Sequence, residues 1–329
     1  MTADTALGAQ STSNPFIDIC LPFLVNGGAF RGRLVLLTGA ITDILTRHCG
    51  PEPVSALLAE AVATAVALAG GLKYIGVFTL QIQSKGAVNT LVADVTSTGE
   101  VRGWAKFDAA AVAAEVLRVR PDGLRPHFVG SEGNLAFTVD QGPDTERYQG
   151  IVELTGDSIA EAVHHYFRQS EQLEAALKVA VAPPKLAGQP WTAAALLLQR
   201  MPEAGGVRLA SPEALDDAWR TAVILLGSLK DAELLDLSIA PERLLARLFT
   251  AIGVVPAARR PIRFKCRCSR TRSVRILASF PVEEISSLAE NGLVTMTCEF
   301  CRTDYVFPVT ELDAIVSNYR AEDERDGQP

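Results

Sequence analysis

The sequence predicts an α+β protein in three parts: a mixed α/β N-terminal domain, a helical linker and a small C-terminal domain. Three observations predict it. Segments with strand-like and helix-like patterns alternate through the first half of the chain. Short amphipathic helical patterns then follow one another, and four of the six cysteines lie near the C-terminus. A chain of 329 residues has room for about two domains or more.

The composition is that of an ordinary globular protein. Hydrophobic residues make up 48% and charged residues 21% of the chain, which excludes a wholly disordered chain and a fibrous one. The net charge of −7 makes the whole molecule a poor non-specific binder of nucleic acid or anionic lipid. The longest nearly apolar stretch, residues 61–72, is shorter than the roughly 20 residues of a bilayer span. Residues 1–15 read as a frayed tail without the features of a signal peptide. We therefore expect a cytoplasmic protein with reduced thiols and no membrane partner.

The N-terminal domain is expected over residues 15–182 and should contain several strands. The turn at residues 97–100 joins two of them as a hairpin. The predicted strands are Arg31–Leu37, Tyr74–Gln83, Ala87–Thr96, Val101–Phe107, Asn134–Val139 and Gly150–Leu154.

Helices are expected in the same domain at residues 41–48 and 54–69, the second rich in alanine. The capping box at residues 158–161 predicts the start of a third helix. This helix is expected to run to about Val181, because Pro183 and the proline after it end helices.

Residues 183–255 are expected to form the helical linker. Trp191–Arg200 is predicted as a short helix. Ser211, followed by proline, predicts the N-terminus of a longer helix, and Pro241 that of another. The longer helix has an apolar stripe that must be buried against a neighbour; it comprises Leu215, Ala218, Trp219, Ala222, Leu225 and Leu226.

The cysteines indicate a metal site in the C-terminal domain, which is expected over residues 256–320, before an acidic tail. Cys266 and Cys268 form a C-x-C pair, and Cys298 and Cys301 form a C-x-x-C pair. In a cytosolic chain such clustered pairs indicate a metal site before structural disulfides. All four histidines precede residue 166, so the ligands would be four thiolates, a set that suits zinc. An iron–sulfur cluster and a standing pair of disulfides are the less favoured alternatives.

The one-residue spacer of the first pair is unusual, because structural zinc sites mostly use C-x₂₋₄-C. Positions i and i+2 of an extended strand lie on the same side, so both sulfurs can reach one metal. The same spacing can close a strained, easily reduced disulfide. The layout can therefore hold zinc when reduced and form two local disulfides when oxidised.

A run of basic residues surrounds the first pair, with no acidic residue among them. Such cations stabilise a zinc centre with four thiolates and keep sulfur in its reactive thiolate form. A solvated basic face is the simpler interpretation, and a nucleic-acid patch is a further one. The run comprises Arg259, Arg260, Arg263, Lys265, Arg267, Arg270, Arg272 and Arg275.

The chain resembles the heat-shock protein 33 family of redox-regulated holdase chaperones. The resemblance rests on the motifs KCRCS at 265–269 and TCEFC at 297–301. It also rests on LVADVTSTGEVRGWA at 91–105 and on LAFTVDQGPDTERYQGIVEL at 135–154, which runs on into HHYFRQSEQL at 164–173. Signatures so far apart, in the right order, make the resemblance specific.

The resemblance implies that Cys266, Cys268, Cys298 and Cys301 bind one zinc per chain in the reduced state and are the redox cysteines. It implies Cys266–Cys268 and Cys298–Cys301 disulfides after oxidation. It further implies an ATP-independent chaperone that binds unfolding client proteins and is a homodimer when active. Two positions depart from the family's pattern: Arg302 stands where a small residue is common, and Thr271 where glutamate is common.

Two other functions are weighed against this one. A zinc-ribbon nucleic-acid binder would use the arginine-rich segment 259–275. A thiol–disulfide oxidoreductase would use Cys298 and Cys301, although four cysteines that share a metal favour a closed site. The sequence contains no Walker-type phosphate loop and no evident catalytic triad, so we expect a binding protein without catalytic residues. Cys20 and Cys49 are expected to be ordinary small hydrophobic residues.

Overall fold

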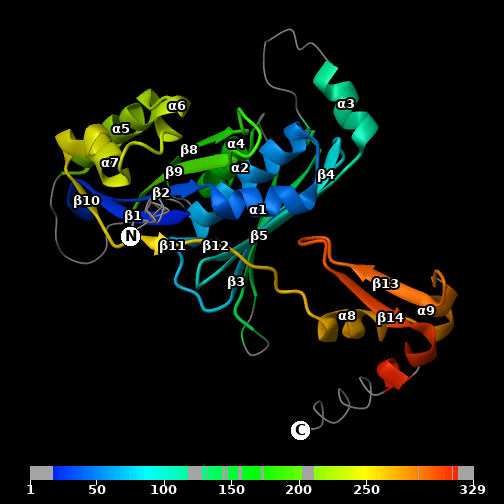
Figure 1. Cartoon of the computed structure of the whole chain (residues 1–329). Helices are drawn as coiled ribbons and strands as arrows, with labels where there is room; N and C mark the ends of the chain where they lie inside the picture. The colour runs from blue at the N-terminus through cyan, green and yellow to red at the C-terminus, as the bar shows by residue number, and fades with distance from the viewer. Residues whose placement is uncertain are drawn as a thin grey trace, which may run out of the picture.

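The computed structural model describes residues 18–117, 128–130, 132–142, 145, 147–154, 158–171, 174–201, 211–287, 289–312 and 314–317. Within these residues the chain forms two six-stranded sheets and a two-stranded sheet, together with helices, which confirms the predicted α+β class. Figure 1 shows the two large sheets with helices between and beside them, and a small lobe near the C-terminus. The predicted tails, residues 1–15 and the acidic residues after 320, lie outside the described residues.

The first sheet is antiparallel, with the strand order β10-β1-β2-β9-β8 and with β11 beside β10 on β1. Its central strands, β2 and β9, are buried along most of their length, so both of their faces are covered. The strands are β1 (Ile19–Val25), β2 (Phe30–Leu37), β8 (Ala175–Ala182), β9 (Thr192–Arg200), β10 (Val254–Pro256) and β11 (Arg260–Pro261).

The second sheet has the order β12-β5-β4-β3-β6-β7 and is antiparallel except where β12 joins β5. In β3 and β5 buried residues alternate with partly exposed ones, so one face is buried and the other is accessible. The strands are β3 (Val77–Ser84), β4 (Val88–Thr96), β5 (Glu100–Phe107), β6 (Gly133–Asp140), β7 (Tyr148–Glu153) and β12 (Arg263–Phe264).

Helix α2 (Glu52–Ala69) lies between the two sheets and shares one apolar core with both. By length and composition α2 could cross a membrane, but 72% of it is buried inside the protein, which makes it a core helix. Helix α1 (Gly39–His48) packs beside it. Helix α3 (Ala109–Leu117) follows β5, and α4 (Ile159–Tyr166) follows β7 and continues as a π-helical turn, Phe167–Glu171.

The linker helices α5 (Pro212–Ser228), α6 (Asp231–Leu234) and α7 (Pro241–Phe249) cover the outer face of the first sheet (Figure 1). Ser211 caps α5 by accepting a hydrogen bond from the backbone N–H of Ala214 at 3.3 Å, as predicted. Trp219 of α5 meets Phe30 edge-to-face at a centroid distance of 5.2 Å. The second core of the molecule is therefore the interface between the linker and the first sheet.

The C-terminal lobe, residues 265–317, is called the cysteine module below. It contains α8 (Arg270–Leu277), α9 (Val282–Ser287), β13 (Leu293–Thr297), β14 (Asp304–Pro308) and helical residues at 309–312 and 314–317. Its own core is small, as a unit of this size allows. The buried apolar residues are Val274, Leu277, Ile285, Val294, Phe307, Leu312 and Val316.

One predicted helix is wrong, and another begins after Ser158 as predicted but is much shorter than expected. The helix that begins after Ser158 ends within the π-helical turn, and Ala175–Ala182 is strand β8. Thr192–Arg200, predicted as a helix, is strand β9 at the centre of the first sheet. Both segments are short apolar runs rich in alanine or leucine, whose pattern does not separate a strand from a buried helix, and pairing of β8 with β9 decided between them. Residue 183 thus falls between two paired strands, and the division at 182, 255 and 320 remains a prediction.

Candidate metal centre

The first cysteine pair lies in the short segment between β12 and α8. Ser269 directly follows Cys268 and caps α8, because its side chain accepts a hydrogen bond from the backbone N–H of Arg272 at 3.2 Å. On the other side, the backbone N–H of Lys265 donates to the carbonyl of Val101 on β5 at 3.0 Å. Cys266 and Cys268 are therefore held between β5 of the second sheet and the capped helix α8.

The second pair lies in the turn that joins β13 to β14. The strands remain in register up to Thr297 and Asp304. The backbone N–H of Cys298 then donates to the carbonyl of Thr303 at 2.9 Å, and the N–H of Arg302 donates back to the carbonyl of Cys298 at 2.8 Å. This tight turn directs both cysteine side chains to the same side.

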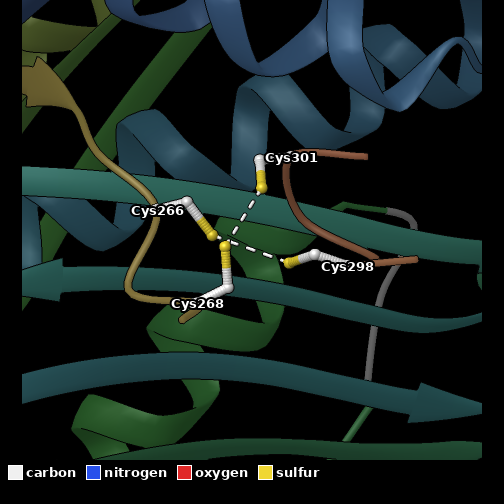
Figure 2. Close-up of side chains that lie close together, drawn as sticks. All are labelled: Cys266, Cys268, Cys298 and Cys301. Carbon is white, nitrogen blue, oxygen red and sulfur yellow. Dashed lines mark hydrogen bonds between the residues drawn. The ribbon is translucent and has the colours of Figure 1, made fainter. Parts of the chain in front are cut away.

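The four sulfur atoms converge on one point, as Figure 2 shows. All four lie within 4.8 Å of one another, with Cys266 and Cys298 at 3.7 Å and Cys268 and Cys301 at 3.3 Å. Zinc bonds of about 2.3 Å in a tetrahedron place sulfurs about 3.8 Å apart. The set of four thiols therefore fits zinc, which Cys266, Cys268, Cys298 and Cys301 would hold with no further ligand. No other group of this kind occurs in the described ranges.

As thiols the four side chains influence one another strongly. Burial raises the pKa of Cys268 to about 12, with its neighbours Cys301 and Cys266 adding to the effect. Burial also acts to raise the pKa of Cys301, but hydrogen bonds with Thr303, Cys268 and Cys266 together outweigh it and lower that pKa to about 7. One low-pKa thiol among crowded neighbours is a favourable starting point for metal binding, because zinc takes up thiolates and releases protons.

Arg302, the departure from the family's small residue, has a left-handed backbone with φ of 58°. A side chain in this conformation costs about 1–2 kcal/mol relative to glycine. Its exposed ion pair with Glu299, at 3.2 Å, returns about 1 kcal/mol at most. We expect Arg302→Gly to stabilise the cysteine module by up to about 1 kcal/mol. Thermal unfolding of the zinc-loaded protein measures this, and a lower midpoint for the variant would contradict it.

The basic residues around the first pair do not form one free face. Most of them bind groups of the protein. Arg259 binds Glu242 of α7, Arg263 and Lys265 both bind Glu100, Arg267 binds Asp94, Arg270 reaches the carbonyl of Val306, and Arg272 the carbonyl of Arg267. Lys265 and Arg263 together hold the pKa of Glu100 below its ordinary value. Arg263, Lys265, Arg270 and Arg272 are also exposed to solvent, so the interpretation as a solvated basic face stays open for them, whereas Arg259 and Arg267 are partly buried.

The two remaining cysteines differ from each other. Cys20 is 1% exposed in the core between the first sheet and α2, where burial raises its pKa to about 11, so the predicted hydrophobic role is confirmed. Cys49 is exposed at the C-terminal end of α1, so the same expectation is wrong for it. Its thiol donates to the carbonyl of Thr46 at 2.9 Å.

Known protein families provide the identification. The family model described as "Hsp33 protein" matches residues 18–308. The chain belongs to the Hsp33 family. This confirms the resemblance that the cysteine motifs and the two N-terminal signatures predicted.

Individual relatives agree with the Hsp33 assignment. The "33 kDa chaperonin" of Caulobacter vibrioides strain NA1000 / CB15N is 35% identical over 290 residues, covering 88% of this chain and 94% of the relative. The "33 kDa chaperonin" of Pseudomonas syringae pv. tomato is 36% identical over 304 residues, covering 91% and 93%. The crystal structure of the Hsp33 homologue of Thermotoga maritima has a TM-score of 0.75 at 22% identity and covers 92% of this chain and 98% of that one, which shows the shared fold.

The sequence located the four cysteines of the Hsp33 chain correctly in one cluster but missed the residues that seat the cluster on the second sheet. Asp94 of β4 and Phe300, between the cysteines of the second pair, belong to this contact. The C-x-C spacing could have indicated Arg267 as part of this contact. In an extended segment successive side chains point to opposite sides, so Arg267 points away from the two sulfurs and toward another partner.

Proposed function

We propose that this chain is a redox-regulated, ATP-independent holdase chaperone that binds unfolding proteins under oxidative stress. In the reduced state Cys266, Cys268, Cys298 and Cys301 hold one zinc ion. Oxidation forms two disulfides, releases the zinc and activates the protein. The observation that supports this most is the convergence of four thiols within 4.8 Å, in a module whose own core is small.

The module's dependence on zinc follows from magnitudes. Its core has seven buried apolar residues among those described. Structural zinc contributes about 10–16 kcal/mol in finger peptides, whereas a whole domain is stable by only about 5–15 kcal/mol. Loss of the zinc therefore exceeds what the remaining contacts can offset, and the module unfolds.

The chemistry of activation balances with an oxidant of the peroxide class. Two thiolates form one S–S bond and give two electrons to one peroxide, whose O–O bond breaks; with two protons from the solvent, its two oxygen fragments leave as water and an alcohol, or as two waters from hydrogen peroxide. A second peroxide forms the second disulfide in the same way. Zinc leaves as Zn²⁺ with its charge unchanged. We propose the pairs Cys266–Cys268 and Cys298–Cys301, as the resemblance to the family implies; partners in the same short segment also stay close together once the module unfolds. Loops so short restore little stability.

The linker is where unfolding of the module would expose apolar surface. Arg259 lies in the segment that leads to the module and binds Glu242 of α7 through two hydrogen bonds, at 2.8 and 2.6 Å. The same segment adds β10 and β11 to the first sheet. When the module unfolds, this segment loses one anchored end, and α5 and α7 can leave the sheet. The surface then uncovered, with Trp219 and Phe30 on its two sides, is apolar and suits an unfolding client.

The remaining parts of the proposal follow from family membership. The names of the relatives describe chaperonins, and we propose unfolded or partly unfolded proteins as partners of this chain, in the cytoplasm, with a homodimer after oxidation. We propose no catalytic residue. The nucleic-acid alternative finds little support, because Arg259, Arg263 and Arg267 are engaged by Glu242, Glu100 and Asp94.

The proposal is tested by following zinc release and suppression of client aggregation in the same samples during oxidation. Zinc can be measured with a colorimetric chelator and aggregation by light scattering of a thermally unfolding client. We expect both to rise together and both to reverse after reduction with added zinc. Equal suppression by the fully reduced, zinc-loaded protein would overturn the redox switch. Peptide mapping of the oxidised protein tests the disulfide pairs.

A further inference from the structure

Arg267 stands between the cysteines of the first pair and makes the closest contact between the module and the second sheet. Its guanidinium donates to Asp94 Oδ2 at 2.6 Å. Cys266 and Cys268 meanwhile direct their sulfurs to Cys298 and Cys301. Because one residue separates the two cysteines in an extended segment, their sulfurs point to one side and the Arg267 side chain points to the opposite side.

Asp94 is a buried carboxylate with a full set of donors. It is 5% exposed and accepts hydrogen bonds from the hydroxyl of Thr79 at 2.6 Å and from Nε of Arg102 at 2.7 Å. Arg102 and Thr79 belong to the same sheet as Asp94, whereas Arg267 comes from the module. Because a buried charge that loses a partner is strongly destabilised, the sheet favours the docked position of Arg267.

Phe300 stands between the cysteines of the second pair and reaches the same place. The guanidinium carbon of Arg102 lies 3.9 Å from the centroid of the Phe300 ring, within the range of a cation–π contact. The ring also lies 6.4 Å from that of Trp104 on β5. Arg102, fixed by Asp94, therefore contacts one cysteine pair through Phe300, and Asp94 contacts the other through Arg267.

We propose that Asp94, Arg102, Arg267 and Phe300 form a latch that couples zinc binding to docking of the module on the second sheet. The residues between the cysteines reach the sheet together only while the four sulfurs are held at one point. Zinc binding therefore favours docking, and docking must favour zinc binding by the same factor. The latch rests on the proposed zinc site and adds the residues that set how readily it opens.

A simpler explanation is that Arg267 only adds positive charge near the thiolates. The two explanations predict opposite changes in zinc affinity when Asp94 is replaced by asparagine. If charge alone mattered, removal of a negative carboxylate by Asp94→Asn would strengthen zinc binding, because the centre with four thiolates is itself negative. A latch predicts weaker binding, because the neutral amide no longer anchors Arg267.

The experiment measures the zinc affinity of the full-length reduced protein by competition with a chelator of known affinity. The variants are Arg267→Met, Asp94→Asn and the double variant. Arg272→Met is the matched control, because it removes a cation from the same segment. Among the described contacts, the Arg272 guanidinium donates to the backbone carbonyl of Arg267, within the module, and to no group of the second sheet. We expect each single latch variant to weaken zinc binding about 5- to 150-fold, the usual range of such coupling. The double variant should bind zinc no more weakly than the single variant with the lower zinc affinity, because both single changes break the same contact. Arg267→Lys should recover part of the lost zinc affinity.

Hydrogen exchange reports on docking without reference to affinity. The backbone N–H groups of Arg263 and Lys265 donate to the carbonyls of Gly99, in the turn between β4 and β5, and of Val101 on β5. With zinc still bound, a peptide that covers these residues should exchange faster in Arg267→Met than in the wild type or in Arg272→Met. If Asp94→Asn does not fold, judged by thermal unfolding, hydrogen exchange in Arg267→Met still decides, because loss of a nearby charge alone would leave docking unchanged.

The outcomes separate the latch from the proposed function. Zinc affinity and exchange in Arg267→Met that match the wild type, or tighter zinc binding in Asp94→Asn, would overturn the latch and leave the redox chaperone intact. Variants that behave as expected, in a protein whose reduced and oxidised forms suppress aggregation equally, would support the latch and overturn the proposed function.

Discussion

Replacement of Cys298 by serine is expected to unfold the cysteine module while the two large sheets remain folded. The exchange removes one of the four proposed zinc ligands, and a zinc contribution of about 10–16 kcal/mol is as large as or larger than the stability of a whole domain, about 5–15 kcal/mol. The sheets share a separate core around α2, which the module does not enter. Hydrogen exchange should therefore rise sharply over β13 and β14 and remain slow over β3 and β4.

The matched control is Cys49→Ser, because this thiol is exposed at the C-terminal end of α1 and is not one of the four clustered cysteines. The control should keep one zinc per chain and the exchange pattern of the wild type. Slow exchange throughout the module of Cys298→Ser, in protein shown to lack zinc, would contradict the idea that metal holds the module folded.

Replacement of Trp219 by alanine is expected to activate the reduced, zinc-loaded protein. Trp219 is 7% exposed and packs edge-to-face on Phe30, so its removal weakens the attachment of α5 to the first sheet by about 3–5 kcal/mol. The buried residues of α5 are Trp219, Ala222 and Leu226, of which Trp219 is the largest, whereas α7 packs on the sheet separately, with the rings of Phe249 and Phe23 stacked at 5.9 Å. The linker should then detach while zinc stays bound, and aggregation of a client should be suppressed without oxidant.

Ile224→Ala is the control on the same helix, because Ile224 is 70% exposed and faces away from the sheet. It should behave as the wild type in light scattering and in binding of an apolar fluorescent dye. A reduced Trp219→Ala protein that is folded, zinc-loaded and inactive would argue against the covered face of the first sheet as the client surface.

The cluster of four cysteines could be predicted from the sequence because the chemistry of each pair is local. A C-x-C and a C-x-x-C pair each bring two sulfurs together within one turn or strand, so only their mutual approach had to be inferred. The structure brings all four together. The hairpin through residues 97–100 and the N-cap at Ser211 were predictable for the same reason, since turn and cap signals also depend on near neighbours.

The strands β8 and β9 could not be predicted because their sequences suit two structures. Leu196, Leu197 and Leu198 are all fully buried, so the strand shows no alternation that would separate it from a buried helix. Only pairing with β2 and β8 selects the extended form. Propensity is a weak guide where tertiary contacts decide.

The contact of Asp94 with Arg267 could not be predicted either, because it joins residues far apart in the sequence. The two residues lie 173 positions apart, and nothing near either residue indicates the other. Within the arginine run, Arg267 also resembles its neighbours in sequence. The fold alone distinguishes it, by placing its guanidinium against the one carboxylate that also holds Arg102.

The most direct test of the account is the metal content and free-thiol count of freshly purified, reduced protein, with hydrodynamic size measured on the same sample before and after mild oxidation. The account predicts one zinc per chain and a compact molecule at first. After oxidation it predicts loss of the zinc and of four thiols, and a larger hydrodynamic size. Reduced protein that contains no metal and is equally compact would contradict the account.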